Sequence, residues 1–340
     1  MSSALRAETD AIVIGAGPVG LFAVFELGML RLKCHVVDAL PAIGGQLTAL
    51  YPEKPIYDIP GFPKIVAADL VERLMEQAAP FHPKFHLDAS VESLARLPDD
   101  RWEVCLSDGR ALIAPVVVIA AGAGAFGPNR PPLDGLADFE GKSVFYLVQK
   151  REDFRGKRIV IAGGGDSAVD WAISLADVAA QIMVVHRRAK FRAAPESEAR
   201  LKALADQGRI ELVVPYQLQG LEGSAGRMEA VRVATLDGKV KTLPADVLLA
   251  FFGLSSQLGP IAKWGLTMDG SQIVVDPATL RTTLKGVFAI GDVAGYPGKL
   301  KLILQGFSEA AMAAQAAYAI ARPREALHFE HSTTTGLPVA

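Results

Sequence analysis

Residues 11–20 read AIVIGAGPVG, a short apolar run that ends in a glycine-rich turn. A helical stretch follows at 19–30, and a second apolar run at 34–37 stops at Asp38. Strand, turn, helix and strand in this order make a βαβ unit, whose two strands lie parallel in one sheet. The stretch therefore predicts an α/β fold built on a parallel sheet.

The residues of this turn match a dinucleotide-binding fingerprint, in which each glycine has its own role. Gly15 allows the tight turn, Gly17 lets the backbone approach a pyrophosphate, and Gly20 lets helix and strand pack closely. Pro18 lies in the same turn, and the helix that starts there presents unpaired N–H groups to a phosphate. Asp38, at the end of the second strand, is placed to bind ribose hydroxyls. The alternative is a glycine turn with a solvated aspartate.

The same pattern occurs again further along the chain. We expect a strand at 158–162, a helix at 167–176 and a strand at 181–185. Gly15 aligns with Gly163 and Asp38 with His186 at one constant offset, which indicates a structural duplication. The second fingerprint is the GxGxxA variant, and its candidate nucleotide-binding residues are Gly163, Gly165, Asp166, Ser167 and Ala168.

The two units differ at the position that decides nucleotide specificity. Where the first has Asp38, the second has His186, followed by Arg187, Arg188 and Arg192. An acidic residue would repel a 2′-phosphate, whereas guanidinium groups bind it through charge-assisted hydrogen bonds. The second site is therefore expected to prefer NADP(H), with a solvated basic turn as the alternative. The first suits FAD or NAD, and FAD with NADPH is the useful pair because a hydride can pass between them.

The bulk composition is that of a globular protein of about two domains. The chain has 340 residues, half of them hydrophobic, and a net charge of −2, which gives no general attraction to nucleic acid or membrane. Cys34 and Cys105 are its only cysteines, so a disulfide framework or zinc site is excluded and no metal is expected. Sparse cysteines and an N-terminus without an apolar signal segment predict a cytoplasmic protein.

Two junctions suggest how the chain is divided. Further strands are expected at 102–106, 111–120 and 287–290, and an alanine-rich helix at 306–321. The glycine- and proline-rich stretch Gly122–Gly135 lacks periodicity, and a matching junction lies near Leu280–Gly286. They predict a first nucleotide domain at 1–122, a second at 123–285, and the remainder of the first with the tail at 286–340.

Several separated motifs carry a resemblance to a known family. Gly44–Leu47 reads GGQL, Gly291–Gly295 reads GDVAG, and His186–Ala193 reads HRRAKFRA. Together they resemble the thioredoxin-reductase-like flavoproteins. Ala49–Asp58 (ALYPEKPIYD) and the terminal His331–Thr333 (HST) more narrowly resemble the ferredoxin–NADP reductases of that group. The resemblance spans nearly the whole chain and implies two Rossmann-like, three-layer ββα domains, the NADPH domain being inserted into the FAD domain.

The resemblance also implies roles for single residues along the FAD. Asp38 would hold the adenosine ribose, and Val91 would contact the adenine through its backbone. Asp292 would bond the ribityl chain of the flavin. A carboxylate between a buried strand and glycines needs polar partners, which makes Asp292 hard to explain as mere packing.

The remaining roles lie around the flavin ring. Gln46 and Tyr51 would contact the ring, Tyr51 by stacking, and Phe126 would lie on the linker against the cofactor. His331 and Thr333 of the tail would cover the other face of the flavin, usually that of the partner subunit in a homodimer. For Tyr51 and Phe126, ordinary packing is the alternative.

The chain departs from the disulfide reductases of this group. They carry a Cys-x-x-Cys pair shortly before the second fingerprint, where this chain has Val144–Lys150, VFYLVQK. Without a cysteine pair to relay them, electrons must leave directly from the flavin edge. Hydride transfer between nicotinamide and flavin requires no residue as a general acid or base. The expected function is a ferredoxin (or flavodoxin)–NADP⁺ reductase. The alternatives are an NADPH-dependent reductase of a separate disulfide protein or quinone, and a slow-turnover nucleotide-binding regulatory module.

A carrier of this kind is acidic, so a basic patch on the reductase would steer it into place. Two groups of residues are candidates. One is a basic run between Lys142 and Arg158, and the other is Lys299 with Lys301 after the GDVAG motif. Solvated charges without a docking role are the alternative.

Overall fold

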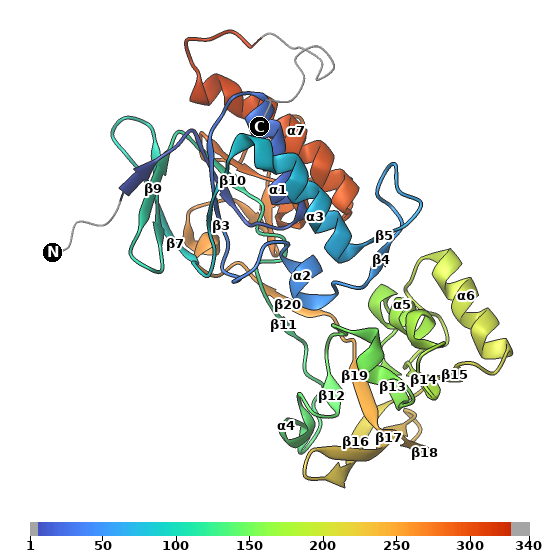
Figure 1. Ribbon diagram of the computed structural model, residues 1–340. Helices are drawn as coiled ribbons and strands as arrows, with labels where there is room; N and C mark the ends of the chain where they lie inside the picture. Colours follow the sequence, from blue (N-terminus) through green and yellow to red (C-terminus); the bar gives the residue numbers. More distant parts are fainter. Residues whose placement is uncertain (1–5, 328–340) are drawn as a thin grey trace. The chain divides into compact units, whose positions relative to one another are not determined.

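The computed structural model describes residues 6–327, which form two compact units (Figure 1). Unit 1 contains the chain up to Phe126 and again from Ser256, and unit 2 contains Gly127–Ser255. Unit 2 is therefore inserted into the chain of unit 1, as the resemblance implied. The chain leaves unit 1 along β11 (Ala125–Pro128) and returns along β20 (Leu254–Gln257), and these two strands pair with each other.

Unit 1 is built on a five-stranded, fully parallel sheet. Its strands, in sheet order, are β23 (Val287–Ala289), β10 (Val116–Ile119), β2 (Ala11–Ile14), β3 (Cys34–Val37) and β6 (Lys84–His86). Helices α1 (Pro18–Met29), α3 (Ala67–Ala78) and α7 (Ile303–Ala321) lie together beside the sheet (Figure 1). The central strands are buried along their whole length, as expected for a sheet covered on both faces.

A second sheet of unit 1 corrects one of the expected strands. It contains β1 (Arg6–Glu8), β9 (Ala111–Ala114), β8 (Trp102–Leu106) and β7 (Val91–Arg96). The single strand expected at 111–120 is in fact β9 and β10, which belong to different sheets. Pro115 separates them, because proline cannot donate a hydrogen bond within a sheet and suits the point where the chain changes sheet.

Unit 2 repeats the arrangement with its own five-stranded parallel sheet. The strands, in order, are β12 (Val144–Phe145), β19 (Val247–Ala250), β13 (Arg158–Ala162), β14 (Gln181–Val185) and β15 (Glu211–Val213). Three antiparallel strands, β16 (Gln217–Ser224), β17 (Arg227–Ala234) and β18 (Val240–Pro244), form a second sheet. Helices α5 (Asp166–Leu175) and α6 (Pro195–Asp206) complete the unit. The predicted α/β fold with two Rossmann-like units is thus confirmed.

Short elements connect these layers. They are α2 (Gln46–Leu50), β4 (Pro55–Ile56), β5 (Ile65–Val66), α4 (Leu136–Phe139), β21 (Met268–Asp269), β22 (Gln272–Val274) and β24 (Ala294–Gly295), with 3₁₀ turns η1 (Ala79–Phe81), η2 (Arg151–Phe154), η3 (Gly259–Lys263) and η4 (Gly291–Val293). None of the helices within residues 6–327 is long and apolar enough to cross a membrane.

The structure places the second junction elsewhere than the sequence indicated. The chain returns to unit 1 at Ser256, well before the expected junction at Leu280–Gly286. Residues of this segment, among them Leu258 and Ile273, are buried in the core of unit 1, and β22 pairs with β24. A segment belongs to the domain whose core its side chains contact. A glycine-rich junction in the sequence does not show these contacts, so the junction alone could not assign the segment.

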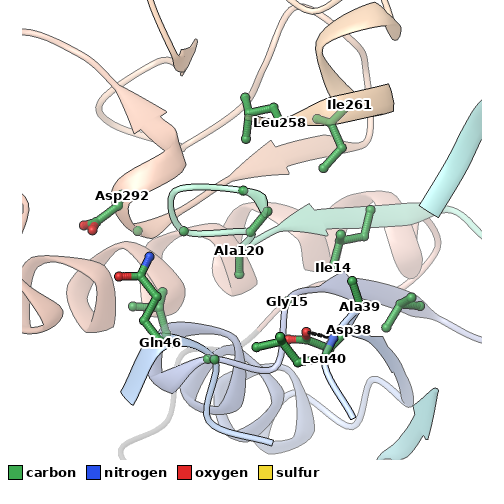
Figure 2. A pocket seen from close by; sticks show the side chains of 18 of the residues that line it. Ile14, Gly15, Asp38, Ala39, Leu40, Gln46, Ala120, Leu258, Ile261 and Asp292 are labelled. Carbon is green, nitrogen blue, oxygen red and sulfur yellow. Dashed lines mark hydrogen bonds between the residues drawn. The ribbon is translucent and has the colours of Figure 1, made fainter. Parts of the chain in front are cut away.

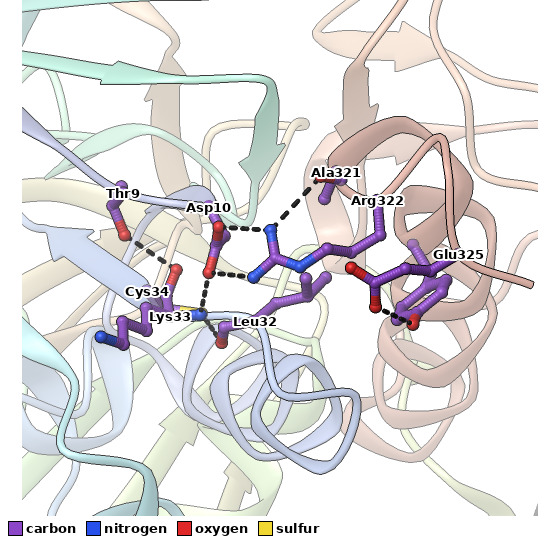
Figure 3. A network of polar contacts seen from close by, with 9 residues as sticks. Thr9, Asp10, Leu32, Lys33, Cys34, Ala321, Arg322 and Glu325 are labelled. Atoms are coloured by element: carbon purple, nitrogen blue, oxygen red, sulfur yellow. Dashed lines mark hydrogen bonds and ion pairs between the residues drawn. The ribbon is translucent and has the colours of Figure 1, made fainter. Parts of the chain in front are cut away.

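One ion pair joins the end of α7 to the start of β2 (Figure 3). Arg322 donates hydrogen bonds from both terminal nitrogens to Asp10, at 2.6 and 2.9 Å, and the Lys33 amide donates to Asp10 at 2.9 Å. Burial opposes ionisation of Asp10, but these donors outweigh it and hold the pKa of that carboxyl below its ordinary value. The pair lies at the end of β2 away from the glycine turn.

A histidine pair in unit 1, His35 buried and His86 half-buried, is expected to make the stability of this unit dependent on pH. His35 on β3 is 5% exposed, and its Nδ1 lies 3.0 Å from Nε2 of His86 on β6. Burial, with the neighbouring His86 and Lys84, lowers the pKa of His35 to about 4. An unfolded histidine titrates near pH ~6.5, so the unfolded chain binds the proton first as the pH falls.

We therefore expect the His35 contribution to stability to be full above pH ~6.5 and to be lost between pH ~6.5 and ~4, by about 2 kcal/mol. Denaturant unfolding at pH 7 and pH 4.5 measures the loss in the wild-type protein. In His35→Gln the same comparison should show a smaller loss, because the titrating group is gone. An unchanged loss in the variant would assign the pH dependence to other groups.

Candidate functional site

A cavity of about 490 Å³ in unit 1 lies at the carboxyl ends of β2, β3 and β10. Figure 2 shows the side chains that line it, with Asp38 toward one end and Gln46 and Asp292 toward the other. The expected FAD residues that line the cavity are Gly15, Gly17, Pro18, Asp38, Gln46, Tyr51, Val91 and Asp292. The sequence pattern thus names residues that the fold gathers around one cavity.

The glycines of the turn differ in what surrounds them. A Cβ on Gly15 would overlap the carbonyl of Ala120, and one on Gly20 would overlap the carbonyl of Gly15, so both are required for packing. Gly17 is different: nothing lies within 4 Å of a Cβ built there, and its backbone (φ −72°, ψ 178°) suits any residue. The space in front of Gly17 is therefore open, and it belongs to the cavity that this residue lines.

The same turn provides the attraction for an anion. Gly17 is the N-cap of α1, and no side chain caps the helix N-terminus. Its first turn holds no acidic residue, so neither a side-chain acceptor nor a negative charge competes for the free N–H groups. A helix N-terminus in this state favours a phosphate through these donors and through the helix dipole.

Asp38 is held ready to accept hydrogen bonds from a ligand. Its Oδ2 accepts from the Ala16 amide at 2.6 Å and its Oδ1 from the Leu40 amide at 2.8 Å. Burial raises the pKa of this carboxyl, while the two amides act in the opposite direction. Each oxygen keeps a lone pair for ribose hydroxyls. Open space at Gly17 and a fixed carboxylate at Asp38 therefore fit the pyrophosphate and ribose of FAD.

The other end of the cavity brings together residues from distant parts of the chain. Gln46 begins α2, Tyr51 follows this helix, and Asp292 belongs to η4. Burial, with the charge of Asp292 nearby, raises the pKa of Tyr51 to about 12, so its hydroxyl stays neutral. A neutral aromatic ring and two polar side chains fit the flavin end of FAD.

Some of the expected FAD residues are not placed in this cavity. Gly20 acts through helix packing, as described above. Phe126 lies on β11, and its side chain is outside the described part of the structure, as are His331 and Thr333.

Sequence reasoning also missed two lining segments, Leu258–Ile261 and Lys301–Ile303. Neither carries a motif, and the first had been assigned to the other domain.

Unit 2 has a cavity of about 630 Å³ at the carboxyl ends of β13, β14 and β19, as unit 1 has at the ends of its own parallel strands. Of the expected NADPH residues, Gly163, Gly165, His186, Arg187 and Arg192 line it. Asp166, Ser167, Ala168 and Arg188 do not. Arg130 and Tyr216 also line the cavity, and no local motif marked them.

The second glycine turn repeats the geometry of the first. Gly165 is the N-cap of α5 (φ −97°, ψ −179°), and a Cβ there would have only the Arg192 carbonyl nearby, at 3.9 Å. The Arg192 amide donates to the Gly164 carbonyl at 2.6 Å, which holds Arg192 beside the turn. Ala168 packs against Gly163, and Asp166 accepts from the Ala194 amide at 3.1 Å.

The ring of His186 forms part of the lining of this cavity but carries no positive charge near pH 7. Its ring covers Gly164, where a Cβ would overlap it, and packs 5.4 Å from the ring of Phe191. Burial and the neighbouring Arg187 lower the pKa of His186, so it is neutral near pH 7. The positive charge at the cavity therefore comes from Arg187 and Arg192, which are exposed, because Arg130 is paired with Glu140.

The structure corrects the expected docking residues. Lys299 forms an ion pair with Glu309, and its side chain is only 4% exposed, so it cannot meet a partner protein. Lys301 is exposed and borders the first cavity. Three arginines of the basic run in unit 2 are neutralised by ion pairs, which are Arg151–Asp177, Arg155–Glu152 and Arg158–Asp246.

Neither cysteine is placed for dithiol chemistry. Cys34 is buried on β3, and burial raises the pKa of its thiol. Cys105 is half-buried on β8, and neither residue lines one of the two cavities. The stretch that carries the cysteine pair in disulfide reductases of this fold contains β12 here.

Each of the two α/β units has a dinucleotide-binding turn that lines a cavity. This arrangement defines a two-domain nucleotide-dependent oxidoreductase. The chain belongs to the pyridine nucleotide-disulphide oxidoreductase family, whose family model matches residues 9–321.

Curated relatives agree with this membership, and a solved structure shares the fold. A protein of Paramagnetospirillum magneticum named ferredoxin–NADP reductase is 69% identical over 97% of this chain and 98% of its own length. One of the same name from Rhodospirillum rubrum is 64% identical over 99% of both chains. The crystal structure of thioredoxin reductase from Lactococcus lactis matches with a TM-score of 0.79 at 23% identity, over 93% of this chain and 99% of that one. This last likeness concerns the fold alone.

Proposed function

We propose that the chain is an FAD-dependent ferredoxin–NADP⁺ reductase, with flavodoxin as a second possible carrier. The observation that carries the proposal is the contrast between the two sites. Asp38 lies at the first dinucleotide cavity, whereas Arg187 and Arg192 lie at the second. The lack of a cysteine pair beside either cavity, and relatives named ferredoxin–NADP reductase at 69% and 64% identity, support it.

Bound FAD would supply hydride exchange with NADPH and single-electron exchange with the carrier protein. The chain contributes binding and orientation. In unit 1, Asp38 holds the ribose, and the amides at the start of α1 meet the pyrophosphate. Gln46, Tyr51 and Asp292 orient the flavin end. We assign no general acid or base.

In unit 2 the guanidinium groups select the nucleotide. Arg187 and Arg192 bind the 2′-phosphate of NADP(H) by charge-assisted hydrogen bonds, which NADH cannot form. The open space before Gly165 admits the pyrophosphate at the start of α5. Asp166, Ser167 and Arg188 do not line the cavity, and we propose no direct contact between them and the nucleotide.

The assembly and the location are further proposals. Leu302, which lines the first cavity, and its near neighbours Leu300 and Leu304 are exposed apolar side chains, which supports a covering element there. We propose the tail of a partner subunit, with His331 and Thr333, as that element in a homodimer. Phe126 remains a proposed flavin contact, and cytoplasmic location remains a prediction from cysteine use.

An assay with three kinds of acceptor, a one-electron carrier protein, a disulfide protein and a quinone, tests the function. Purified protein with NADPH should reduce cytochrome c rapidly only when ferredoxin or flavodoxin is added, and much more slowly with NADH. Thioredoxin with a disulfide reagent, or a quinone, should give little turnover. Fast turnover that depends on thioredoxin would overturn the proposal, and a yellow protein that NADPH cannot bleach would favour a regulatory nucleotide-binding module.

A cysteine-free variant separates the proposal from disulfide chemistry. Cys34→Ala/Cys105→Ser should keep the wild-type rate of ferredoxin reduction within about twofold, because no thiol lies on the proposed electron path. The rate is measured with saturating NADPH and ferredoxin at equal flavin content. Loss of most of the activity in a folded, FAD-containing variant would place a thiol on that path.

A further inference from the structure

A buried charged cluster lies next to the flavin end of the first cavity. Glu309 of α7 is 1% exposed, and its Oε2 accepts from the Gly291 amide at 2.7 Å. Its Oε1 accepts from the Tyr296 hydroxyl at 2.6 Å and forms the ion pair with Lys299. Gln305 in turn donates to the Tyr296 hydroxyl at 2.8 Å. Every contact of the carboxylate is thus made inside the protein.

This carboxylate contacts two segments of the chain that contribute lining residues to the cavity. Gly291 begins η4, and both Gly291 and Asp292 line the cavity. Lys299 lies in the segment that leads into α7, and Lys301–Ile303 of the same segment also line the cavity. Glu309 itself does not line it. Glu309 therefore holds both segments from behind the residues that line the cavity.

Stability alone is a poor reason for such a cluster. Removing a carboxylate and an ammonium group from water costs free energy, and a well-packed apolar pair is often equally stable or more so. What an apolar pair cannot do is accept a hydrogen bond from the Gly291 amide. Gly291 is buried, so its amide would cost free energy if it had no partner. Its φ of 73° lies in the left-handed region, which glycine adopts without strain.

We propose that Glu309 is a positioning residue for FAD: it fixes the Gly291 amide and thereby orients Asp292 toward the flavin end of the cofactor. Lys299 balances the charge of Glu309, and Tyr296 fills its remaining acceptor position. The proposal rests on FAD binding in unit 1. Asp292 is held from a second side, because Gln272 donates to its backbone carbonyl at 3.3 Å and to that of Ala294 at 2.7 Å.

Two charge-neutral double variants isolate the acceptor. Glu309→Gln/Lys299→Met retains an oxygen for the Gly291 amide, whereas Glu309→Met/Lys299→Met removes it, and neither leaves a buried charge unpaired. The readout is the rate of FAD release from purified holoprotein, followed by the rise in flavin fluorescence. The Met/Met variant should release FAD at least about tenfold faster than wild type, and the Gln/Met variant within about threefold of it.

A second ion pair on α7 provides the control for general destabilisation. Asp10→Asn/Arg322→Met removes the pair at the other end of the helix, where neither residue lines the cavity. It should lower the melting temperature and leave FAD release unchanged. If it accelerated release as much as the Met/Met variant, or if the Met/Met variant released FAD at the wild-type rate, Glu309 would have no positioning role.

A measurement on the wild-type holoprotein covers the case in which the Met/Met variant does not fold. Amide hydrogen exchange at Gly291 should be slow, because its N–H is bonded to a buried carboxylate. Exchange as fast as in an unstructured peptide would overturn the proposal. A wild-type protein that contains no FAD would instead contradict the proposed function itself, so the two failures are distinguishable.

Discussion

Replacing Gly17 with alanine is expected to give a folded protein that no longer retains FAD. The backbone at Gly17 suits any residue, and a Cβ there meets no protein atom within 4 Å. The methyl group instead enters the space where the pyrophosphate approaches the start of α1. We expect FAD affinity to fall at least about 100-fold, because the close backbone contact and its hydrogen bonds are lost together.

The flavin-to-protein absorbance ratio after desalting measures this loss, and the melting temperature of the apoprotein shows whether the fold is kept. Gly165→Ala is the matched variant in unit 2, and it should retain FAD while raising the KM for NADPH. Gly20→Ala should fail differently, because its Cβ would overlap the Gly15 carbonyl and disturb the fold itself. A yellow Gly17→Ala protein with wild-type FAD content would exclude a pyrophosphate at this turn.

Removing the two arginines at the second cavity is expected to abolish the preference for NADPH. Arg187 and Arg192 line this cavity and are exposed, so alanine at both positions should leave stability almost unchanged. Each charge-assisted hydrogen bond to the 2′-phosphate is worth roughly 1.5–3 kcal/mol, so KM for NADPH should rise about 100-fold or more. KM for NADH should stay within about threefold.

Arg188 supplies the control. It follows Arg187 directly but does not line the cavity, so Arg188→Ala should raise KM for NADPH by less than about fivefold. Steady-state kinetics with both nucleotides at constant ionic strength give the comparison. An equal rise for NADPH and NADH in Arg187→Ala/Arg192→Ala would mean that the arginines bind the shared part of the nucleotide and do not recognise the 2′-phosphate.

Local sequence patterns predicted the parts of the fold that depend on local physics. The strands at 11–14, 34–37, 158–162 and 181–185 have the predicted bounds, because short apolar runs next to glycine turns leave few alternatives. The glycine turns and Asp38 were found for the same reason. Each of these features is encoded within about thirty residues of chain, the length of one βαβ unit.

Features that depend on distant contacts were not predictable in this way. The segment 256–285 joins unit 1 through core contacts such as Leu258 and Ile273, and no local signal marks them. Lys299 resembled a docking charge because its partner, Glu309, lies on another element. Arg130 and Tyr216 reach the second cavity from segments outside the fingerprint. In each case the residue type was visible, but its neighbours were not.

Rapid-mixing reduction of the flavin tests the central claim, that FAD and NADPH bind separate sites in one chain and pass electrons to a carrier protein. Anaerobic holoprotein is mixed with NADPH or NADH while the visible flavin absorbance is followed, and ferredoxin is then added. We predict fast bleaching by NADPH, much slower bleaching by NADH, and recovery of the absorbance when oxidised ferredoxin accepts the electrons. Equal bleaching by both nucleotides, or recovery only with a disulfide acceptor, would contradict the account.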